Sequence, residues 1–165
     1  MRDDAEFTAF AEAAAVRLRQ IAYLMCRDWH LAQDLTQTTL TKLYVAWHRV
    51  NHKDGDPFLY ARRILLNSLL DHRRRRSSTE LAADRLPDLP RTADPTDVRL
   101  TLLGALALLP RRSRAIVILR YWEDHSVAVT AEILGVNESV VKSQSMRALA
   151  TLREHLGEDR ELFFS

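Results

Sequence analysis

Apolar side chains recur every three or four residues along most of this chain, which is the period of an amphipathic α-helix. In the first half, this period predicts one helix from about Asp4 to Cys26, a second with its apolar stripe between Leu31 and Val50, and a third that begins at Pro57. Asp56 should cap the third helix, since its carboxylate can accept backbone N–H groups and proline suits the first helical position.

The same pattern separates inner from outer positions on the predicted helices. Tyr44 and Trp47 share the apolar stripe of the second helix, so we expect both in the core rather than stacked on a ligand. Trp122 is expected in the core for the same reason. On the third helix, Arg62, Arg63 and Asn67 lie off the apolar stripe and should be open to solvent or to a partner. These assignments leave the N-terminal helices with a polar face that is available for binding.

The apolar period disappears between Ser77 and Thr96, where Ser, Thr, Pro and Asp accumulate. Residues 77–97 carry five acidic side chains against two arginines, which predicts an extended acidic linker. The period then returns and predicts four more helices, one of them capped by Ser126 and the last running from Glu138 to about Leu156. The expected fold is therefore all-α, with two small helical domains, residues 1–76 and 97–165, joined by a linker of residues 77–96.

Residues 131–147, AEILGVNESVVKSQSMR, have the spacing of a helix-turn-helix. Ala131 would let two helices approach closely, Gly135 could take the left-handed conformation that ends the first helix, and Val141 would hold the second helix from its buried side. The outward face would carry groups of the kind that read base edges and phosphates, namely Ser139, Lys142, Ser143, Met146 and Arg147. Helical hairpins without a nucleic-acid role show the same pattern, so this motif alone does not decide the function.

Composition narrows the class of protein. The 165 residues carry a formal net charge of only +2, so the basic character is local: one run from Arg73 to Arg76, and another at Arg111, Arg112 and Arg114. The single cysteine, Cys26, is compatible with a reducing compartment, and no apolar run is long enough to cross a bilayer. We therefore expect a cytoplasmic protein without a membrane segment.

Neither a metal site nor a cofactor is expected. Cys26, His30 and Asp34 are spaced by four residues, but Asp28 and Trp29 should break the helix between them. The sequence also contains no phosphate-binding glycine loop and no nucleophile elbow. An enzyme is therefore the least favoured class.

Three segments together resemble the extracytoplasmic-function sigma factors of bacterial RNA polymerase: DWHLAQDLTQTTLTKLYVAW, ARRILLNSLLDHRRRR and LPRRSRAIVILRYWEDHSVAVTAEILGVNESVVKSQSMRALATLR. The stretch LRYWED and the abundant arginines are most similar to actinobacterial members. The resemblance implies a subunit that binds core RNA polymerase, recognises two promoter elements and opens the downstream one, with residues 1–76 as sigma region 2 and 97–165 as region 4. The alternative is a stand-alone helix-turn-helix regulator, which would require neither the segment DLTQTTL nor an acidic linker.

The resemblance also implies where the polymerase binds. A family segment of the form DLVQETF docks on the coiled coil of the β′ subunit and reads DLTQTTL here, so Asp34, Leu35, Gln37 and Thr38 should face that coiled coil. Thr38 replaces the usual glutamate, which removes a charge-assisted contact. Leu109 to Leu119 match a segment near the flap of the β subunit, and the acidic linker matches one that threads through the polymerase.

Promoter contacts follow from the same matching. The loop from Val50 to Pro57 matches the family's specificity loop, which takes up a base flipped from the −10 element. The residues implied at the −10 element lie on this loop and on the next helix: His52, Lys53, Asp54, Asp56, Arg62, Arg63, Asn67, Arg73 and Arg74.

The −35 element should meet the predicted recognition helix, at Asn137, Ser139, Lys142, Ser143, Met146 and Arg147. Family members often carry Gly-Thr where this chain has Ser139 and Val140, so a hydroxyl contact is replaced or shifted by one residue. An anti-sigma factor is a further candidate partner, which the sequence does not identify.

Overall fold

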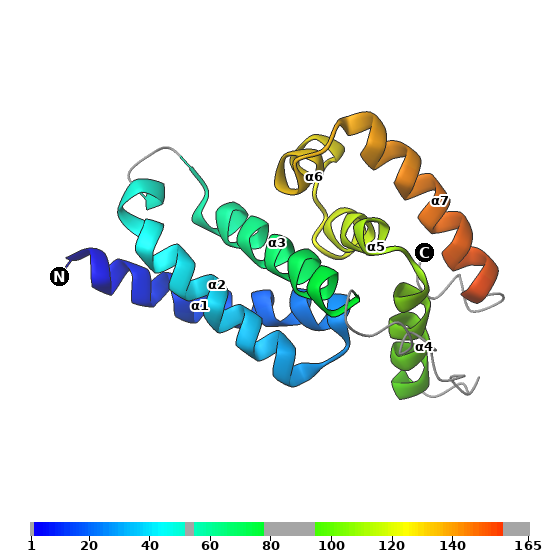
Figure 1. Ribbon diagram of the computed structural model, residues 1–165, viewed down its shortest axis with the longest axis horizontal. Helices are drawn as coiled ribbons and strands as arrows, with labels where there is room; N and C mark the ends of the chain where they lie inside the picture. The colour runs from blue at the N-terminus through cyan, green and yellow to red at the C-terminus, as the bar shows by residue number, and fades with distance from the viewer. Residues whose placement is uncertain (1, 52–54, 78–94, 157–165) are drawn as a thin grey trace. The chain divides into compact units, whose positions relative to one another are not determined.

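The computed structural model describes residues 2–51, 55–77 and 95–156, and of 72–77 and 95–101 it describes the backbone only. Over these residues the elements are helical, with no strand among them, which confirms the expected all-α fold (Figure 1). In chain order they are α1 (Arg2–Cys26), α2 (Trp29–Asn51), α3 (Pro57–Ser77), α4 (Pro95–Leu108), α5 (Arg111–Val117), the π-helical turn η1 (Ile118–Trp122), α6 (Val127–Leu134) and α7 (Glu138–Leu156).

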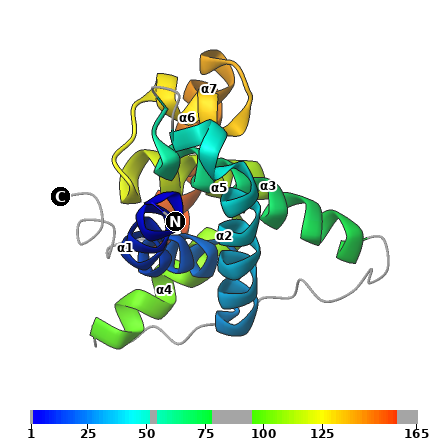
Figure 2. The ribbon, with the colours of Figure 1, turned by 90° about the vertical axis from the view of Figure 1, so that its left-hand side faces the viewer.

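The chain divides into two compact units, the first built on α1 to α3 and the second on α4, α5, η1, most of α6, and α7. In the first unit each helix contacts the other two, as the end-on view in Figure 2 shows for α1 and α2. The core is mainly aliphatic, and its largest fully buried side chains are Leu18, Ile21, Leu43, Leu65 and Leu66. Burial of such apolar side chains stabilises this small bundle.

Local signals explain where the helices of the first unit begin and end. Arg27 adopts a φ of 57° and ends α1, and the side chain of Asp28 then accepts the backbone N–H of Leu31 at 3.1 Å, which caps α2. Asp56 caps α3 in the same way, because its Oδ1 accepts the N–H of Phe58 at 2.9 Å. The predicted helix break at Asp28 and the predicted cap at Asp56 are therefore confirmed.

Of the two aromatic residues of α2 that were predicted in the core, only Trp47 is buried. Trp47 is 5% exposed and lies against the rings of Phe7 and Phe10, as expected. Tyr44 is 52% exposed, so its assignment to the core is wrong. Its ring contacts Phe7 at the edge of the bundle, while its hydroxyl group reaches a carboxylate and stays near water, as the amphipathic character of tyrosine favours.

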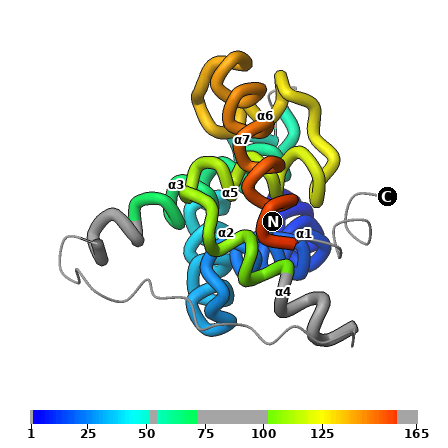
Figure 3. The backbone as a smooth tube through the Cα atoms, turned by 90° about the vertical axis from the view of Figure 1, so that its right-hand side faces the viewer, coloured from blue at the N-terminus to red at the C-terminus, as the bar shows by residue number. Residues whose placement is uncertain are grey.

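The second unit is arranged around α5 and η1, and Figure 3 traces its course from α4 to the end of α7. Its fully buried side chains come from several helices and include Ile116, Ile118, Leu119, Val141 and Leu152. Both α4 and α5 contact α7. The C-terminal helix α7 is thereby held from one side along its length.

Arg114 is a buried member of this unit, although it belongs to one of the local runs of arginines. Its side chain is 3% exposed, and its guanidinium group donates hydrogen bonds to the carbonyl oxygens of Leu106, Ala107 and Leu109 at 2.8 to 3.1 Å. These carbonyls lie at the C-terminal end of α4, where helical partners are missing and the dipole is negative. Arg114 therefore caps α4 from α5.

A π-helical turn replaces the expected continuation of α5. The N–H of Glu123 bonds to the carbonyl oxygen of Ile118 at 2.9 Å, five residues back, and Asp124 follows with a φ of 55°. The wider turn shifts the residues after Leu119 off the apolar stripe. Trp122 is consequently 54% exposed, and the prediction that it lies in the core is wrong.

Candidate nucleic-acid interface

The helix-turn-helix is formed by α6 and α7. Ser126 caps α6, as predicted, by accepting the N–H of Val129 at 3.1 Å. Gly135 ends this helix with a φ of +64°, and the N–H of Val136 bonds back to the carbonyl oxygen of Ala131 at 3.1 Å. Ala131 and Val141 are both buried, at 5% and 0% exposure. The left-handed conformation of Gly135 and the buried position of Val141 are therefore confirmed, and Ala131 is buried as its predicted role requires.

The start of α7 is fixed by Asn137. Its backbone carbonyl oxygen accepts the N–H groups of Val140 and Val141 at 3.1 and 3.2 Å, so Asn137 occupies the N-cap position. Glu138 follows in the first turn, where a negative charge suits the positive end of the helix dipole. Local signals thus define where α7 begins.

The outer face of α7 brings together the residues predicted at the −35 element. All six are exposed: Asn137, Ser139, Lys142, Ser143, Met146 and Arg147. The inner face carries Val141, Ser145, Ala148 and Leu152, which are buried. Met146 is 74% exposed, which leaves an apolar side chain without internal packing on a face of cations and hydroxyl groups. Such a mixture suits contact with base edges, thymine methyl groups and phosphates.

A second exposed face lies on α2. Asp34, Gln37 and Thr38 are exposed there, whereas Leu35, which was predicted with them, is 8% exposed and packs in the core. One residue that the sequence analysis missed is Val45, which continues this face and is 84% exposed. The sequence indicates this residue only by its apolar side chain at a position outside the apolar stripe of α2. The face therefore combines polar groups with one aliphatic contact.

The residues predicted at the −10 element are brought together only in part. Arg63 and Asn67 are exposed on α3, and Asp56 is exposed at its start. Arg62 is 5% exposed, so the prediction that it is open to solvent is wrong. Its guanidinium carbon lies 3.9 Å from the ring centroid of Phe58, a cation–π contact that draws the side chain inward. His52, Lys53 and Asp54 lie outside the described residues, as do the side chains of Arg73 and Arg74.

No group of three metal-ligating side chains occurs among the described residues. Cys26 ends α1, whereas His30 and Asp34 belong to α2, and the break at Arg27 and Asp28 separates them. None of the helices described by the structure combines the length and the hydropathy of a membrane span.

Comparison with known proteins decides the family. Residues 10–79 match the family model of Sigma-70 region 2, and residues 99–152 match that of Sigma-70 region 4. The RNA polymerase sigma-E factor of Streptomyces antibioticus is 39% identical over 156 residues, which cover 89% of this chain and 84% of the relative. The ECF RNA polymerase sigma factor SigM of Mycobacterium tuberculosis is 32% identical, over 86% of this chain and 72% of its own. The chain belongs to the extracytoplasmic-function sigma factors.

Solved structures agree with this sigma factor in fold. The sigma factor RpoE of Bartonella quintana, solved with the anti-sigma factor NepR, superposes with a TM-score of 0.75 at 23% identity, over 93% of this chain and 98% of that one. CnrH, solved with the cytosolic domain of CnrY, gives a TM-score of 0.68 at 23% identity, over 94% and 90% of the two chains. The sequence relatives carry the further conclusion: this is an actinobacterial-type sigma factor that works with RNA polymerase and promoter DNA to direct promoter-specific transcription.

Proposed function

We propose that this sigma factor divides its work between its two units. Residues 1–76 would act as region 2, which binds core polymerase and opens the −10 element, and residues 97–165 as region 4, which reads the −35 element. Residues 77–96 would join them as an acidic linker that runs through the polymerase. The observation that carries the proposal is the outer face of α7, where six predicted contact residues are exposed while Val141 holds the helix from beneath.

The chemistry of that face supports reading of duplex DNA. Lys142 and Arg147 are exposed cations one and a half turns apart, so they can bind a base edge and a phosphate of the same groove. Ser139 replaces the family's glycine, and its hydroxyl group can donate to a phosphate or a base. Met146 can contact a thymine methyl group. Together these groups fit a helix that lies in the major groove.

For the core polymerase, the supporting feature is the exposed face of α2. Asp34, Gln37 and Thr38 would contact the coiled coil of the β′ subunit, and Val45 would add an apolar contact at the end of the same face. Leu35 would act from inside the bundle by fixing this turn of α2, because its side chain is buried. Contacts near the β-subunit flap would come from the segment Leu109 to Leu119.

We also propose that the protein is not an enzyme and that it acts in the cytoplasm. The chain would catalyse no reaction itself, because the exposed polar groups described here bind and position nucleic acid and the polymerase supplies the chemistry. It would act in the cytoplasm, where RNA polymerase meets the chromosome. An anti-sigma factor would be its regulatory partner, since the structural neighbour RpoE of Bartonella quintana was solved in complex with the anti-sigma factor NepR.

Transcription from a random promoter library tests the proposal. Core RNA polymerase purified from Streptomyces coelicolor is mixed with the chain and with duplexes randomised over about forty base pairs, and the starts of the transcripts are mapped. We expect enriched duplexes to share two short elements at a fixed spacing, with no transcripts from core polymerase alone. A chain that binds a duplex site without polymerase and promotes no transcription would instead be a stand-alone regulator.

A further inference from the structure

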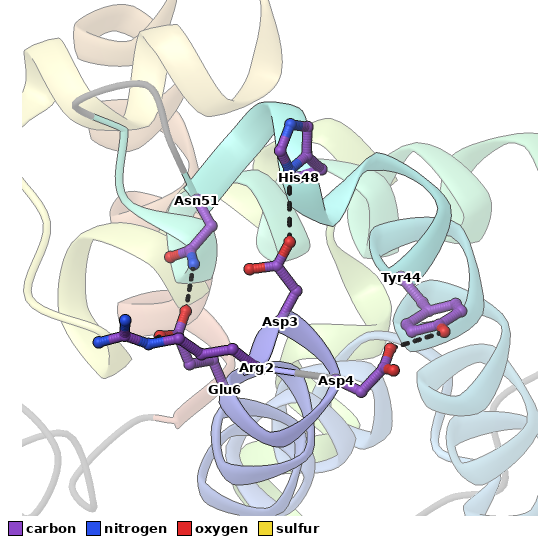
Figure 4. Close-up of polar contacts among 7 residues, drawn as sticks. All are labelled: Arg2, Asp3, Asp4, Glu6, Tyr44, His48 and Asn51. Atoms are coloured by element: carbon purple, nitrogen blue, oxygen red, sulfur yellow. Dashed lines mark hydrogen bonds and ion pairs between the residues drawn. The ribbon is translucent and has the colours of Figure 1, made fainter.

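Three polar contacts join the first turns of α1 to the last turns of α2 (Figure 4). Tyr44 Oη donates to Asp4 Oδ1 at 2.9 Å, and Asn51 Nδ2 donates to Glu6 Oε2 at 3.0 Å. His48 Nδ1 lies 3.3 Å from Asp3 Oδ2. We call these six residues the N-terminal clamp. The clamp ends at Asn51, which is the last residue of α2 and lies at the start of the segment, Val50 to Pro57, that the resemblance assigns to the −10 element.

The clamp is not what holds α1 on α2. Beneath the clamp, the ring centroids of Phe7 and Trp47 lie 5.3 Å apart, and Trp47 is buried. The polar contacts are exposed by comparison: the side chains of Asp3 and His48 are 44% and 84% exposed. Exposed contacts of this kind add little to global stability. Their position at the end of a helix points to a local effect.

Helix ends fray because their last carbonyl groups lack helical partners. Tyr44, His48 and Asn51 are spaced by four and three residues, so they share one face of α2 over its last two turns. Each is held by a different acid of α1, and the side chain of the terminal residue is among them. The hydrogen bond to Asp4 raises the pKa of the Tyr44 phenol, which is the donor of this bond. The last turns of α2 are thereby fixed at several points.

Charge argues against a direct role of these acids in DNA binding. Asp3 and Asp4 suit the N-terminal end of α1, where the helix dipole is positive. The same carboxylates are repelled by the negative C-terminal end of the α2 dipole and by DNA phosphates. Carboxylates placed beside a DNA-binding loop therefore orient protein groups and do not bind the backbone of the nucleic acid.

We propose that the N-terminal clamp positions the end of α2 for base selection at the −10 element, with Asp4 and Glu6 as positioning residues. The inference rests on the proposed function of the loop that follows Asn51. It predicts that loosening the clamp lowers the discrimination between promoter bases and leaves the association with core polymerase intact.

A charge-matched pair of variants tests this. The clamp variant combines Tyr44→Phe, which keeps the ring against Phe7, with Glu6→Ala. The control is Glu12→Ala, which removes one exposed carboxylate of α1 at a position with no contact to α2 among those described. Glu6→Gln serves as the conservative variant, because its amide oxygen can still accept from Asn51.

Two measurements are made on the full-length chain. In amide hydrogen exchange, residues 47–51 of the clamp variant should exchange about three- to tenfold faster than in wild type, the factor expected for two surface contacts. In transcription with Streptomyces coelicolor core polymerase, the ratio of product from the selected promoter to that from promoters with single −10 substitutions should fall about three- to tenfold. Glu12→Ala and Glu6→Gln should resemble wild type in both.

Unchanged exchange at residues 47–51 would overturn the clamp as a positioning device. Faster exchange with unchanged discrimination would also overturn it, since the contacts would then be structural only. Both results presuppose a wild-type chain that initiates transcription. A wild-type chain that directs no initiation would remove the proposed function itself, which keeps the two failures distinct.

Discussion

The guanidinium group of Arg114 donates to the carbonyl oxygen of Leu106 at 2.8 Å, and so joins α5 to the C-terminal end of α4. Two further bonds reach Ala107 and Leu109, and the arginine is 3% exposed. A buried charge is stable here because its N–H groups donate to three carbonyl oxygens near the C-terminal end of α4. The arginine thus satisfies a helix end inside the second unit.

Replacing Arg114 with Met should therefore destabilise the second unit by about 2–3 kcal/mol, because three hydrogen bonds to carbonyl oxygens are lost, two of them buried. Urea denaturation followed by circular dichroism measures the change in the free energy of unfolding. Arg112→Met is the matched control, since Arg112 is exposed two residues away and should change stability by less than about 0.5 kcal/mol. Equal effects of the two substitutions would contradict the capping role.

The second prediction concerns Gly135, in the turn between α6 and α7. A Cβ at this position would meet nothing within 4 Å, so the cost of Gly135→Ala is the left-handed conformation alone, about 1–2 kcal/mol. Gly135→Asn should cost less, because asparagine tolerates this conformation. Thermal denaturation of the three chains gives the order of stability. If alanine and asparagine were equally tolerated, the backbone would not require φ of +64° in solution.

Local signals account for the parts of the fold that the sequence predicts correctly. Caps and turns such as Asp56, Ser126 and Gly135 act through neighbours within a few residues, so their pattern is readable from the chain alone. The bounds of α7 follow from the same kind of signal.

The errors come from individual side-chain contacts and from one irregular turn. Arg62 turns inward because Phe58 offers it a ring face, and Trp122 turns outward because η1 changes the helical period. Neither effect changes the local hydrophobic pattern. For the candidate site, the exposed face of α7 was predictable because it is the complement of a buried stripe, whereas Val45 was missed because an isolated apolar residue on a polar face has no periodic signal.

Arg147 and Lys142 carry the third prediction, which concerns the upstream element. Alanine at either position should weaken binding of the −35 element by about 1–3 kcal/mol if the lost side chain made a good bidentate contact with a base edge. Holoenzyme affinity is measured on the selected promoter and on one with a substituted −35 element. A base contact shows as lost discrimination between them, and a phosphate contact as uniform weakening with a smaller salt dependence. Unchanged affinity on both would remove the residue from the interface.

Docking on the polymerase is the fourth prediction. Replacing Asp34 and Gln37 together with Ala should lower the affinity for core polymerase about tenfold or more, the effect of losing a central interface contact. Both residues are exposed, so the fold should be unaffected. The matched control is Glu12→Ala with Gln20→Ala, an acid and an amide exposed on α1. Fluorescence titration of labelled chain with core polymerase measures the difference, and equal affinities of the two double variants would contradict the proposed docking face.

Asn67 lies exposed on α3, in the register that the resemblance assigns to the opened strand, and leads to a prediction about melting. Asn67→Ala should leave the closed complex intact and lower strand opening about three- to tenfold, since one or two hydrogen bonds to a single strand are lost. Asn67→Asp should lower it further, because the new charge repels the phosphates. Permanganate reactivity of unpaired thymines measures opening. A promoter with a preformed mismatched bubble should restore most of the transcription, because the melting step is then bypassed; a defect that persists on the bubble would place Asn67 outside the melting step.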